Sequence, residues 1–228
     1  MRNIHAVILA GGTGSRIGGN SPKQFLLLGG KALVVYSVEL FRKWGLCKSI
    51  TIVCHKDWMG EMEETVGAYL EGTDRIIEGG DTRHDSTLNA LASIAWDEED
   101  IIFFHDAARP FFQLDELDLL VGSVQTFGAA TLALQSTETT VISSGKSGYT
   151  ERSINRDEVF FVKTPQAVSG KMLHKLTKKD PLEESAPPTD LCSWMERIGE
   201  KTGIVPTSSK NIKITKPEDL SIAESFLR

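Results

Sequence analysis

A glycine-rich segment near the start of the chain combines residue types that bind phosphate. Residues 6–24 read AVILAGGTGSRIGGNSPKQ, an apolar run followed by Gly11, Gly12 and Gly14 and by the cations Arg16 and Lys23. Glycine accepts positive φ and lets a ligand approach the main chain, so successive N–H groups can form an anion-binding concavity. The segment predicts a cradle for a triphosphate, with two full charges added to the amide dipoles. The alternative is a tight strand-to-helix turn with two solvated cations.

Neither standard nucleotide fingerprint fits this loop. A dinucleotide motif, G-x-G-x-x-G, counted from Gly12 and Gly14 needs a glycine where the chain has Ile17. A P-loop needs a lysine directly after its last glycine, and Gly19 is followed by Asn20. A phosphate site here would lie outside both motifs.

An aspartate follows an apolar run in the middle of the chain. Asp106 comes shortly after Ile101–Phe104, where a strand should end, so it is a candidate ligand for Mg²⁺ or for a substrate hydroxyl. The alternatives are that it caps the following helix or pairs with Arg109. The five histidines show no metal-ligand spacing, and His105 is a candidate supporting neighbour of Asp106.

A second polar loop follows another short apolar run. After a Gly-Gly turn, Arg83, Ser86 and Thr87 begin a segment with helical period, and a helix N-terminus binds phosphate or a nucleobase edge through its N–H groups. Simple capping of that helix by Asp81 or Thr82 is the alternative.

The remaining candidate cation lies near the end of the chain. Asn211–Thr215 reads as a strand, which places Lys213 on the face opposite its two isoleucine neighbours, where a lone lysine is usually solvated. A helix should follow, with Thr215 and Glu218 as a capping box and Pro217 in its first turn.

Strands that alternate with helices should position these residues. Apolar or β-branched runs predict strands, and apolar residues with helical period predict three helix faces between or after them. The predicted strands are Ile4–Leu9, Ser49–Cys54, Arg75–Ile77 and Ile101–Phe104, and the helix faces are Val34/Val38/Phe41, Leu88/Leu91/Ala92/Ala95 and Leu117/Leu120/Val121/Val124. This order predicts a Rossmann-like α/β fold, an open and mostly parallel sheet with helices on its faces. Ligands bind at the carboxyl ends of such strands, where the three candidate loops would meet.

A segment without helical period interrupts this pattern. About residues 135–162 mix Thr, Ser and Gly with β-branched residues, which predicts an antiparallel arm protruding from the main sheet. Such an arm has little apolar surface of its own, so it should pack against a second subunit in a homodimer. An ordinary surface hairpin is the alternative.

Composition bounds the class of protein. At 228 residues the chain suits one domain, 1–228, without disulfides: its three cysteines lack the C-x-x-C spacing of a zinc or redox site. A net charge of −6 without any basic run argues against a nucleic-acid partner. There is neither a long apolar stretch nor a signal-peptide pattern, so we expect a cytoplasmic protein without a membrane partner.

Seven ordered motifs resemble one family of the sugar-phosphate nucleotidyltransferase superfamily. They are AGGTGSR (10–16), PKQF (22–25), GGDTRHDS (79–86), HDAARP (105–110), TPQ (164–166), TD (189–190) and NIKITKPEDL (211–220). Together they resemble the 2-C-methyl-D-erythritol 4-phosphate cytidylyltransferases over nearly the whole chain. The resemblance implies a nucleotidyltransferase (GT-A-like) fold and a Mg²⁺-dependent transfer of CMP from CTP to a polyol phosphate, in the non-mevalonate route to isoprenoid precursors.

The resemblance also implies a role for each matching residue. Arg16, Lys23, Arg156 and Lys213 would be catalytic, the first two on the triphosphate and the others on the acceptor phosphate. Nucleotide-binding positions would be Ala10, Gly11, Gly12, Thr13, Gly14, Gly80, Asp81, Arg83, Ser86 and Asp106; acceptor-binding positions would be Asp106, Arg109, Thr139, Thr164 and Thr189. Asp106 would be the metal ligand. Thr139 and Arg156, on the arm, would reach the site of a neighbouring subunit.

Two segments depart from that family's pattern. Residues 136–141 read STETTV where Asp-Thr and then a lysine are usual, and Leu191-Cys192 follows Thr189-Asp190 in place of an acidic residue and alanine. Both segments are similar to the ribitol 5-phosphate cytidylyltransferases, which make CDP-ribitol for surface polymers. That acceptor is therefore the main alternative, and a catalytically silent nucleotide-binding protein on the same scaffold is a distant one.

Overall fold

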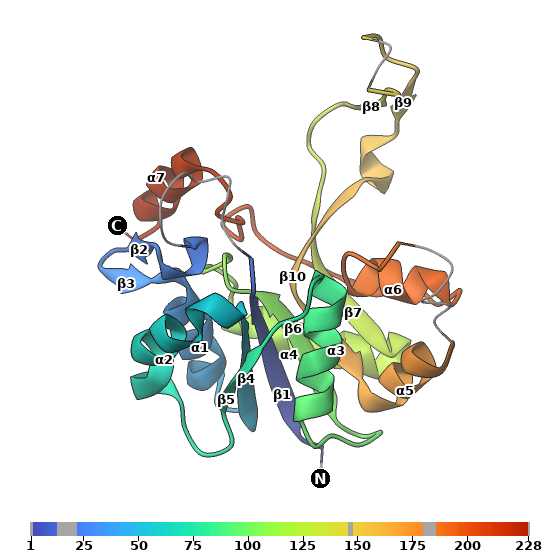
Figure 1. Cartoon of the computed structure of the whole chain (residues 1–228). Helices are drawn as coiled ribbons and strands as arrows, with labels where there is room; N and C mark the ends of the chain where they lie inside the picture. The colour runs from blue at the N-terminus through green and yellow to red at the C-terminus, as the bar shows by residue number, and fades with distance from the viewer. Residues whose placement is uncertain (1, 13–21, 146–147, 180–185, 228) are drawn as a thin grey trace.

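Strands and helices alternate along most of the chain, as the sequence predicts. The computed structural model describes residues 2–12, 22–145, 148–179 and 186–227. The strands are β1 (Ile4–Ala10), β2 (Leu27–Leu28), β3 (Lys31–Ala32), β4 (Ser49–Cys54), β5 (Arg75–Glu78), β6 (Ile101–Asp106), β7 (Ala129–Gln135), β8 (Thr140–Ile142), β9 (Arg152–Ile154), β10 (Phe160–Ser169) and β11 (Gly203–Pro206). The helices are α1 (Leu33–Trp44), α2 (Met59–Val66), α3 (Arg83–Ser93), α4 (Leu114–Phe127), α5 (Gly170–Lys179), α6 (Leu191–Arg197) and α7 (Pro217–Ser225), with short 3-10 turns that include η1 (Lys23–Phe25) and η4 (Arg156–Glu158). Figure 1 shows their arrangement.

Seven strands form one open, mostly parallel sheet, which confirms the predicted fold class. Their order is β11-β7-β10-β6-β1-β4-β5. The strands β6, β1, β4 and β5 run parallel, β11 is parallel to β7, and β10 is antiparallel to both of its neighbours. The parallel strands therefore end at one edge of the sheet, where β1, β5 and β6 lead into the three candidate loops.

Alternating side chains bury both faces of the sheet under helices. Ile8 and Phe103 pack with α1, α2 and α4 on one face, whereas Val7 and Phe104 pack with α3, α5 and α6 on the other. This two-sided burial explains why β1, β4 and β6 read as continuous apolar runs in the sequence. No described helix is long and apolar enough to cross a membrane.

The helix faces follow the predicted period with one correction. The faces of α1 and α4 are buried as expected, but Ala92 and Ala95 are exposed and α3 ends at Ser93. The buried face of α3 instead runs through Thr87, Ala90 and Leu91, a set spaced three and four residues apart.

The predicted arm is present as an antiparallel excursion between β7 and β10. The two-stranded hairpin β8–β9 pairs Thr140 with Ile154 and stands well clear of the rest of the molecule, beyond the edge where β7 ends (Figure 1). Several apolar side chains along the arm and the adjoining end of β10 are exposed, namely Val141, Tyr149, Phe160, Phe161 and Val162.

The C-terminal segment departs from two expectations. Asn211–Thr215 is not a strand: its backbone does not join the sheet, and Ile214 N–H instead donates to Ala108 C=O at 2.9 Å. The cap of α7 uses Asp219 rather than Glu218, because the Asp219 carboxylate accepts bonds from Thr215 N–H and Oγ1–H at 2.7 and 2.8 Å. The bond from Ile214 to Ala108 holds the segment that carries Lys213 against the turn after β6.

Candidate functional site

A polar cavity of about 470 Å³ opens where the three candidate loops meet at the carboxyl edge of the sheet. Its wall comes from the ends of β1 and β6, from η1, from the turn before α3 and from the segment before α7. The lining residues are Leu9, Ala10, Gly11, Gly12, Lys23, Gln24, His55, Gly80, Asp81, Thr82, Arg83, Ser86, Asp106, Ala107, Ala108 and Lys213. This position is the one that open α/β sheets use for ligands.

The Gly79-Gly80 turn is shaped by steric contact with the start of α3. A Cβ at Gly80 would collide with Asp85, and one at Gly79 would lie 2.9 Å from Ser86 Oγ. Gly80 N–H donates to Ser86 Oγ at 3.1 Å, which fixes the turn against the helix. The first loop lies against the same hydroxyl, because a Cβ at Gly11 would lie 3.8 Å from it. Glycine is therefore required at positions 79 and 80 so that this turn can pack against the start of α3.

Helix α3 begins at this turn with a capping box. Thr82 Oγ1 accepts from Asp85 N–H at 3.0 Å, and the Asp85 carboxylate accepts from Thr82 N–H at 3.0 Å. The capping alternative was therefore correct for Thr82 rather than for Asp81. The same cap aims Arg83, the first residue of the helix, across the cavity.

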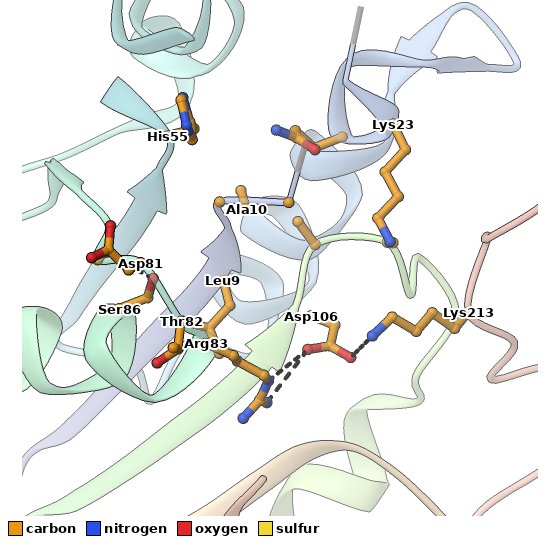
Figure 2. A pocket seen from close by; sticks show the side chains of 16 residues that line it. Leu9, Ala10, Lys23, His55, Asp81, Thr82, Arg83, Ser86, Asp106 and Lys213 are labelled. Atoms are coloured by element: carbon orange, nitrogen blue, oxygen red, sulfur yellow. Dashed lines mark hydrogen bonds and ion pairs between the residues drawn. The ribbon is translucent and has the colours of Figure 1, made fainter. Parts of the chain in front are cut away.

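Asp106 is the centre of a cluster of three cations. Its Oδ2 lies 2.8 Å from Lys213 Nζ, and its Oδ1 lies 3.4 Å from both Nε and Nη2 of Arg83. Arg109 Nε lies 3.6 Å from Oδ2. Figure 2 shows the carboxylate held between Arg83 and Lys213, with Lys23 entering from η1. Each cation comes from a different part of the chain, so only the fold brings them together.

These charges set the protonation state of the cluster. Burial alone would raise the pKa of Asp106, but Arg83 and Lys213 outweigh it and hold that pKa well below its usual range. Burial lowers the pKa of Arg109, and Asp106 opposes this shift. The carboxylate is thus ionised at neutral pH, and its single negative charge leaves the positive charge in excess.

Buried polar groups support this cluster from β10 and from the segment before α7. Thr164 Oγ1 accepts from Asp106 N–H at 3.0 Å. Arg109 Nη1 donates to the Asn211 carbonyl at 3.2 Å, and Asn211 Nδ2 donates to the Thr164 carbonyl at 3.0 Å. Three segments are thereby cross-linked behind Asp106.

The structure brings together many, but not all, of the site residues that were predicted from the sequence. Ten line the cavity: Ala10, Gly11, Gly12, Lys23, Gly80, Asp81, Arg83, Ser86, Asp106 and Lys213. Arg109 and Thr164 contact Asp106 from behind. Thr139 and Arg156 are exposed on the arm, and Thr189 is exposed before α6; these three do not line the cavity. Thr13, Gly14 and Arg16 lie outside the described residues.

Sequence reasoning missed several contributors to the site. His55 and Gln24 line the cavity, and Asn211 joins Arg109 to Thr164. Gln24 and Asn211 stand inside the PKQF and NIKIT motifs, which was a usable signal. His55 follows β4 at the same sheet edge, so its place after a predicted strand could have identified it.

The side chains of the cavity show how Mg²⁺ could be coordinated there. Within the described part of the chain, no three His, Cys, Asp or Glu side chains are grouped to hold a metal ion. Asp106 and Asp81 are the carboxylates that line the cavity. Mg²⁺ is commonly held by one or two carboxylates with phosphate oxygens and waters, so a bound triphosphate would have to supply most of the ligands at this site.

The open sheet places a cation-rich cavity at its carboxyl edge, an arrangement suited to an anionic ligand such as a nucleotide. A family model described as IspD, 2-C-methyl-D-erythritol 4-phosphate cytidylyltransferase, matches residues 4–228. The chain belongs to this family.

Individual relatives agree with that assignment. The chain is 43% identical over 223 residues to the 2-C-methyl-D-erythritol 4-phosphate cytidylyltransferase of Leptospira interrogans, covering 98% of this chain and 92% of that protein. It is 32% identical to the protein of the same name from Geobacillus kaustophilus, over 99% of this chain and 97% of the other. The crystal structure of 4-diphosphocytidyl-2C-methyl-D-erythritol synthase from Anaerococcus prevotii superimposes with a TM-score of 0.84 at 27% identity, over 99% of this chain and 96% of that one.

Proposed function

We propose that this chain transfers the cytidylyl group of CTP to 2-C-methyl-D-erythritol 4-phosphate, giving the CDP-polyol and pyrophosphate. The observation that carries the proposal is the cluster of Arg83, Arg109 and Lys213 around Asp106. Arg83, Asp106 and Lys213 line the cavity together with Gly11 and Gly12, and Arg109 contacts Asp106 from behind. Membership of the family supports the choice of substrates. The reaction would supply the non-mevalonate route to isoprenoid precursors and, because CTP is the donor, would take place in the cytoplasm.

The reaction is an in-line displacement at phosphorus. An oxygen of the acceptor phosphate forms a bond to the α-phosphorus of CTP, the bond from that phosphorus to the bridging oxygen breaks, and pyrophosphate leaves with the electron pair. Both reactants are anions, so their mutual repulsion must be offset by fixed positive charge. The acceptor phosphate is already ionised at neutral pH. The protein is therefore required to position and neutralise the reactants rather than to remove a proton.

Among the described residues, main-chain amides and the cation Lys23 form the nucleotide half of the cavity. The Gly80 turn, Asp81 and Ser86 would hold the cytosine and ribose beside Ala10, Gly11 and Gly12. Lys23 lines the cavity from η1 and would bind the triphosphate, where it would stabilise charge that develops on the leaving pyrophosphate. Arg16 has the same role in the proposal, together with the main chain of Thr13 and Gly14.

The acceptor half is the cluster around Asp106. Arg109 and Lys213 would bind the acceptor, with Lys213 on its phosphate, and the Asp106 carboxylate would accept from a polyol hydroxyl. The excess of positive charge over the single carboxylate favours a dianionic ligand there. Thr164 and Thr189 would complete this half from β10 and from the start of α6.

Mg²⁺ and a second subunit complete the proposal. Asp106 would hold Mg²⁺ with phosphate oxygens of CTP, and the ion would neutralise charge on the triphosphate. The arm would pair two subunits, which the exposed Phe160, Phe161 and Val162 favour, and would carry Thr139 and Arg156 to the partner's cavity.

A pyrophosphate-release assay tests the proposal and its alternatives. The purified chain is given CTP and Mg²⁺ with either 2-C-methyl-D-erythritol 4-phosphate or ribitol 5-phosphate, and kcat/KM is measured for each acceptor. We expect a preference for the methylerythritol phosphate. A preference for ribitol 5-phosphate would assign the chain the other acceptor, and CTP binding without pyrophosphate release would indicate a silent nucleotide-binding protein.

A further inference from the structure

His105 is a buried histidine that the proposed reaction does not use. It precedes Asp106 on β6 and is 0% exposed. Its ring packs against Phe41 and Phe112, with centroid distances of 5.9 and 4.8 Å. A charged imidazolium would lose its hydration at this fully buried position among aromatic side chains, so the imidazole is neutral.

The hydrogen bonds of His105 fix its tautomer. Its Nε2 lies 3.1 Å from the Arg109 carbonyl, which can only accept, so Nε2 must hold the proton. A neutral ring has one N–H, which makes Nδ1 an acceptor. The Thr164 hydroxyl lies 3.0 Å from Nδ1 and must therefore donate its proton to it.

This assignment gives the chain of bonds one direction. Asp106 N–H donates to Thr164 Oγ1, Thr164 Oγ1–H donates to His105 Nδ1, and His105 Nε2–H donates to Arg109 C=O. Arg109 N–H in turn donates to the Asp106 carbonyl at 3.0 Å. The bonds close a ring that joins β6, β10 and the turn after Asp106.

That ring lies directly behind the acceptor half of the cavity. It sets the main chain of the two residues whose side chains pair across 3.6 Å, Asp106 and Arg109. The turn between them also receives Ile214 N–H at Ala108, which holds the segment that carries Lys213. A rotation of the His105 ring would therefore shift the carboxylate relative to two of its cations.

We propose that His105 is a positioning residue of the acceptor half, which aligns Asp106 and Arg109 for the polyol phosphate through Thr164 and the Arg109 carbonyl. The inference rests on the proposed function for its substrate. In this arrangement the Thr164 hydroxyl donates its one hydrogen bond to His105 Nδ1. Thr164 therefore cannot donate to a ligand while this bond is made. The packing of His105 against Phe41 and Phe112 is a separate contribution to stability.

The first test removes the imidazole nitrogens that make the hydrogen bonds and keeps the aromatic packing. His105→Phe retains an aromatic ring against Phe41 and Phe112 but loses both hydrogen bonds. We expect kcat/KM for the acceptor to fall about tenfold or more, as for the loss of one or two buried hydrogen bonds. The Kd for CTP, measured by calorimetry without acceptor, should change less than about twofold. Equal losses for both substrates would overturn the proposal.

Another buried histidine provides the matched control. His5 lies on the neighbouring strand β1, is 3% exposed, and bonds Ser49 Oγ at 2.7 Å, at the opposite end of the sheet. His5→Phe should lower the melting temperature without an acceptor-specific effect. For each variant, the loss in acceptor kcat/KM is compared with the drop in melting temperature. If the ratio of these two changes were the same for His105→Phe and His5→Phe, His105 would have only a structural role.

Conservative variants separate the two bonds. His105→Asn keeps an acceptor near the Nδ1 position, and His105→Gln keeps a donor near the Nε2 position. We expect each to recover part of the acceptor kcat/KM that His105→Phe loses. A double variant, His105→Phe with Thr164→Val, adds a further test. Its loss in kcat/KM for the acceptor, expressed as a free energy, should be smaller than the sum of the two single losses, because both substitutions break the same bond. Full additivity would show that His105 does not act through Thr164.

A spectroscopic measurement tests the assignment without turnover. In the ¹⁵N-labelled full chain at pH 7, the ring nitrogens of His105, assigned by comparison with His105→Phe, should report a neutral ring protonated at Nε2. A ring protonated at Nδ1, or at both nitrogens, would overturn the proposal even if the enzyme were inactive. If the wild-type chain released no pyrophosphate with either acceptor, the proposed function would fail while this result could still stand.

Discussion

Lys213 Nζ lies 2.8 Å from Asp106 Oδ2, the shortest of the three ion pairs at the cavity floor, although 107 positions separate the two residues. The pair exists because Ile214 N–H bonds to Ala108 C=O and Ile214 is fully buried, which holds the adjacent lysine over the end of β6. Lys213 itself is partly exposed, with 37% of its side chain accessible. An ammonium group that is fixed by a carboxylate and still open to a ligand is well placed to bind an anion.

Lys213→Met should remove that charge and leave the packing of the segment intact. We expect kcat/KM for the acceptor to fall about 100-fold or more, with the Kd for CTP less affected, because the lost cation faces the acceptor half. Steady-state kinetics with each substrate varied in turn measure the difference. Lys216→Met, which removes an exposed lysine at the start of α7, is the matched control and should leave both constants unchanged. If Lys213→Met, like Lys216→Met, left kcat/KM for the acceptor unchanged, Lys213 would be excluded from the site.

Much of the site could be predicted because strand ends in a parallel sheet share one edge. The apolar runs before Gly11 and Asp106 located two of the three loops, and the order of strands and helices required their convergence. The strand predicted at Asn211–Thr215 is absent. Alternating apolar and polar residues favour an extended segment, but a strand also needs a neighbouring strand to bond with, and this segment has none among the described residues. A short isoleucine-rich segment can equally be held by one main-chain bond and one buried side chain.

The hydrogen-bond ring behind Asp106 was beyond sequence reasoning. His105 and Thr164 are 59 positions apart, and no local pattern indicates that the TPQ motif crosses behind β6. The same holds for Gln166, whose side chain bonds Thr131, Asp190 and the Leu191 amide and so anchors the start of α6. Such contacts depend on the antiparallel register of β10, which is fixed only in the folded sheet.

Lys23→Ala tests the nucleotide half. Removal of a cation from η1 should lower kcat by about 100-fold or more, because its charge would stabilise the leaving pyrophosphate, while the melting temperature should change little. Lys56→Ala, which removes an exposed lysine from another 3-10 turn near the same sheet edge, is the control and should retain wild-type kcat. An unchanged rate for Lys23→Ala would show that the triphosphate is bound elsewhere.

Gly80→Ala tests the close approach of the second loop to α3. The added Cβ would collide with Asp85, so the turn must move away from Ser86 and the helix cap. We expect the free energy of unfolding to fall by about 1–3 kcal/mol and the Kd for CTP to rise about tenfold. Gly122→Ala is the control, because this glycine lies on the exposed side of α4 with open space around it. It should be neutral or stabilise the protein by up to about 1 kcal/mol.

Mixing two variants tests whether the arm acts on the partner's site. Arg156→Ala changes the arm and Lys213→Met changes the cavity, and in the proposed homodimer each variant alone should be nearly inactive. If Arg156 reaches the partner, each mixed dimer has one site with both residues intact, so a random mixture should recover about a quarter of wild-type activity. Mixing each variant with itself is the control. No recovery, with mixed dimers verified by mass spectrometry, would place Arg156 in its own subunit's site or outside the reaction.

The buried histidines predict how stability depends on pH. An unfolded histidine binds a proton near pH 6.5, whereas burial lowers the folded pKa of His105 to about 3 and that of His5 in the same direction. Below pH 6.5 the unfolded chain therefore binds more protons than the folded one, and the free energy of unfolding falls as pH is lowered.

His105 alone should contribute about 2 kcal/mol of the loss between pH 7 and pH 5. Urea unfolding followed at pH 7, 6 and 5 measures this slope, and His105→Phe should show a smaller one whatever its absolute stability. Asp106 cannot account for the difference, because its depressed pKa makes its stabilising effect disappear only at lower pH, below about 4. An identical slope in wild type and His105→Phe would mean that the folded His105 binds its proton near pH 6.5, as the unfolded ring does, and that its bond from Thr164 is lost only below that pH.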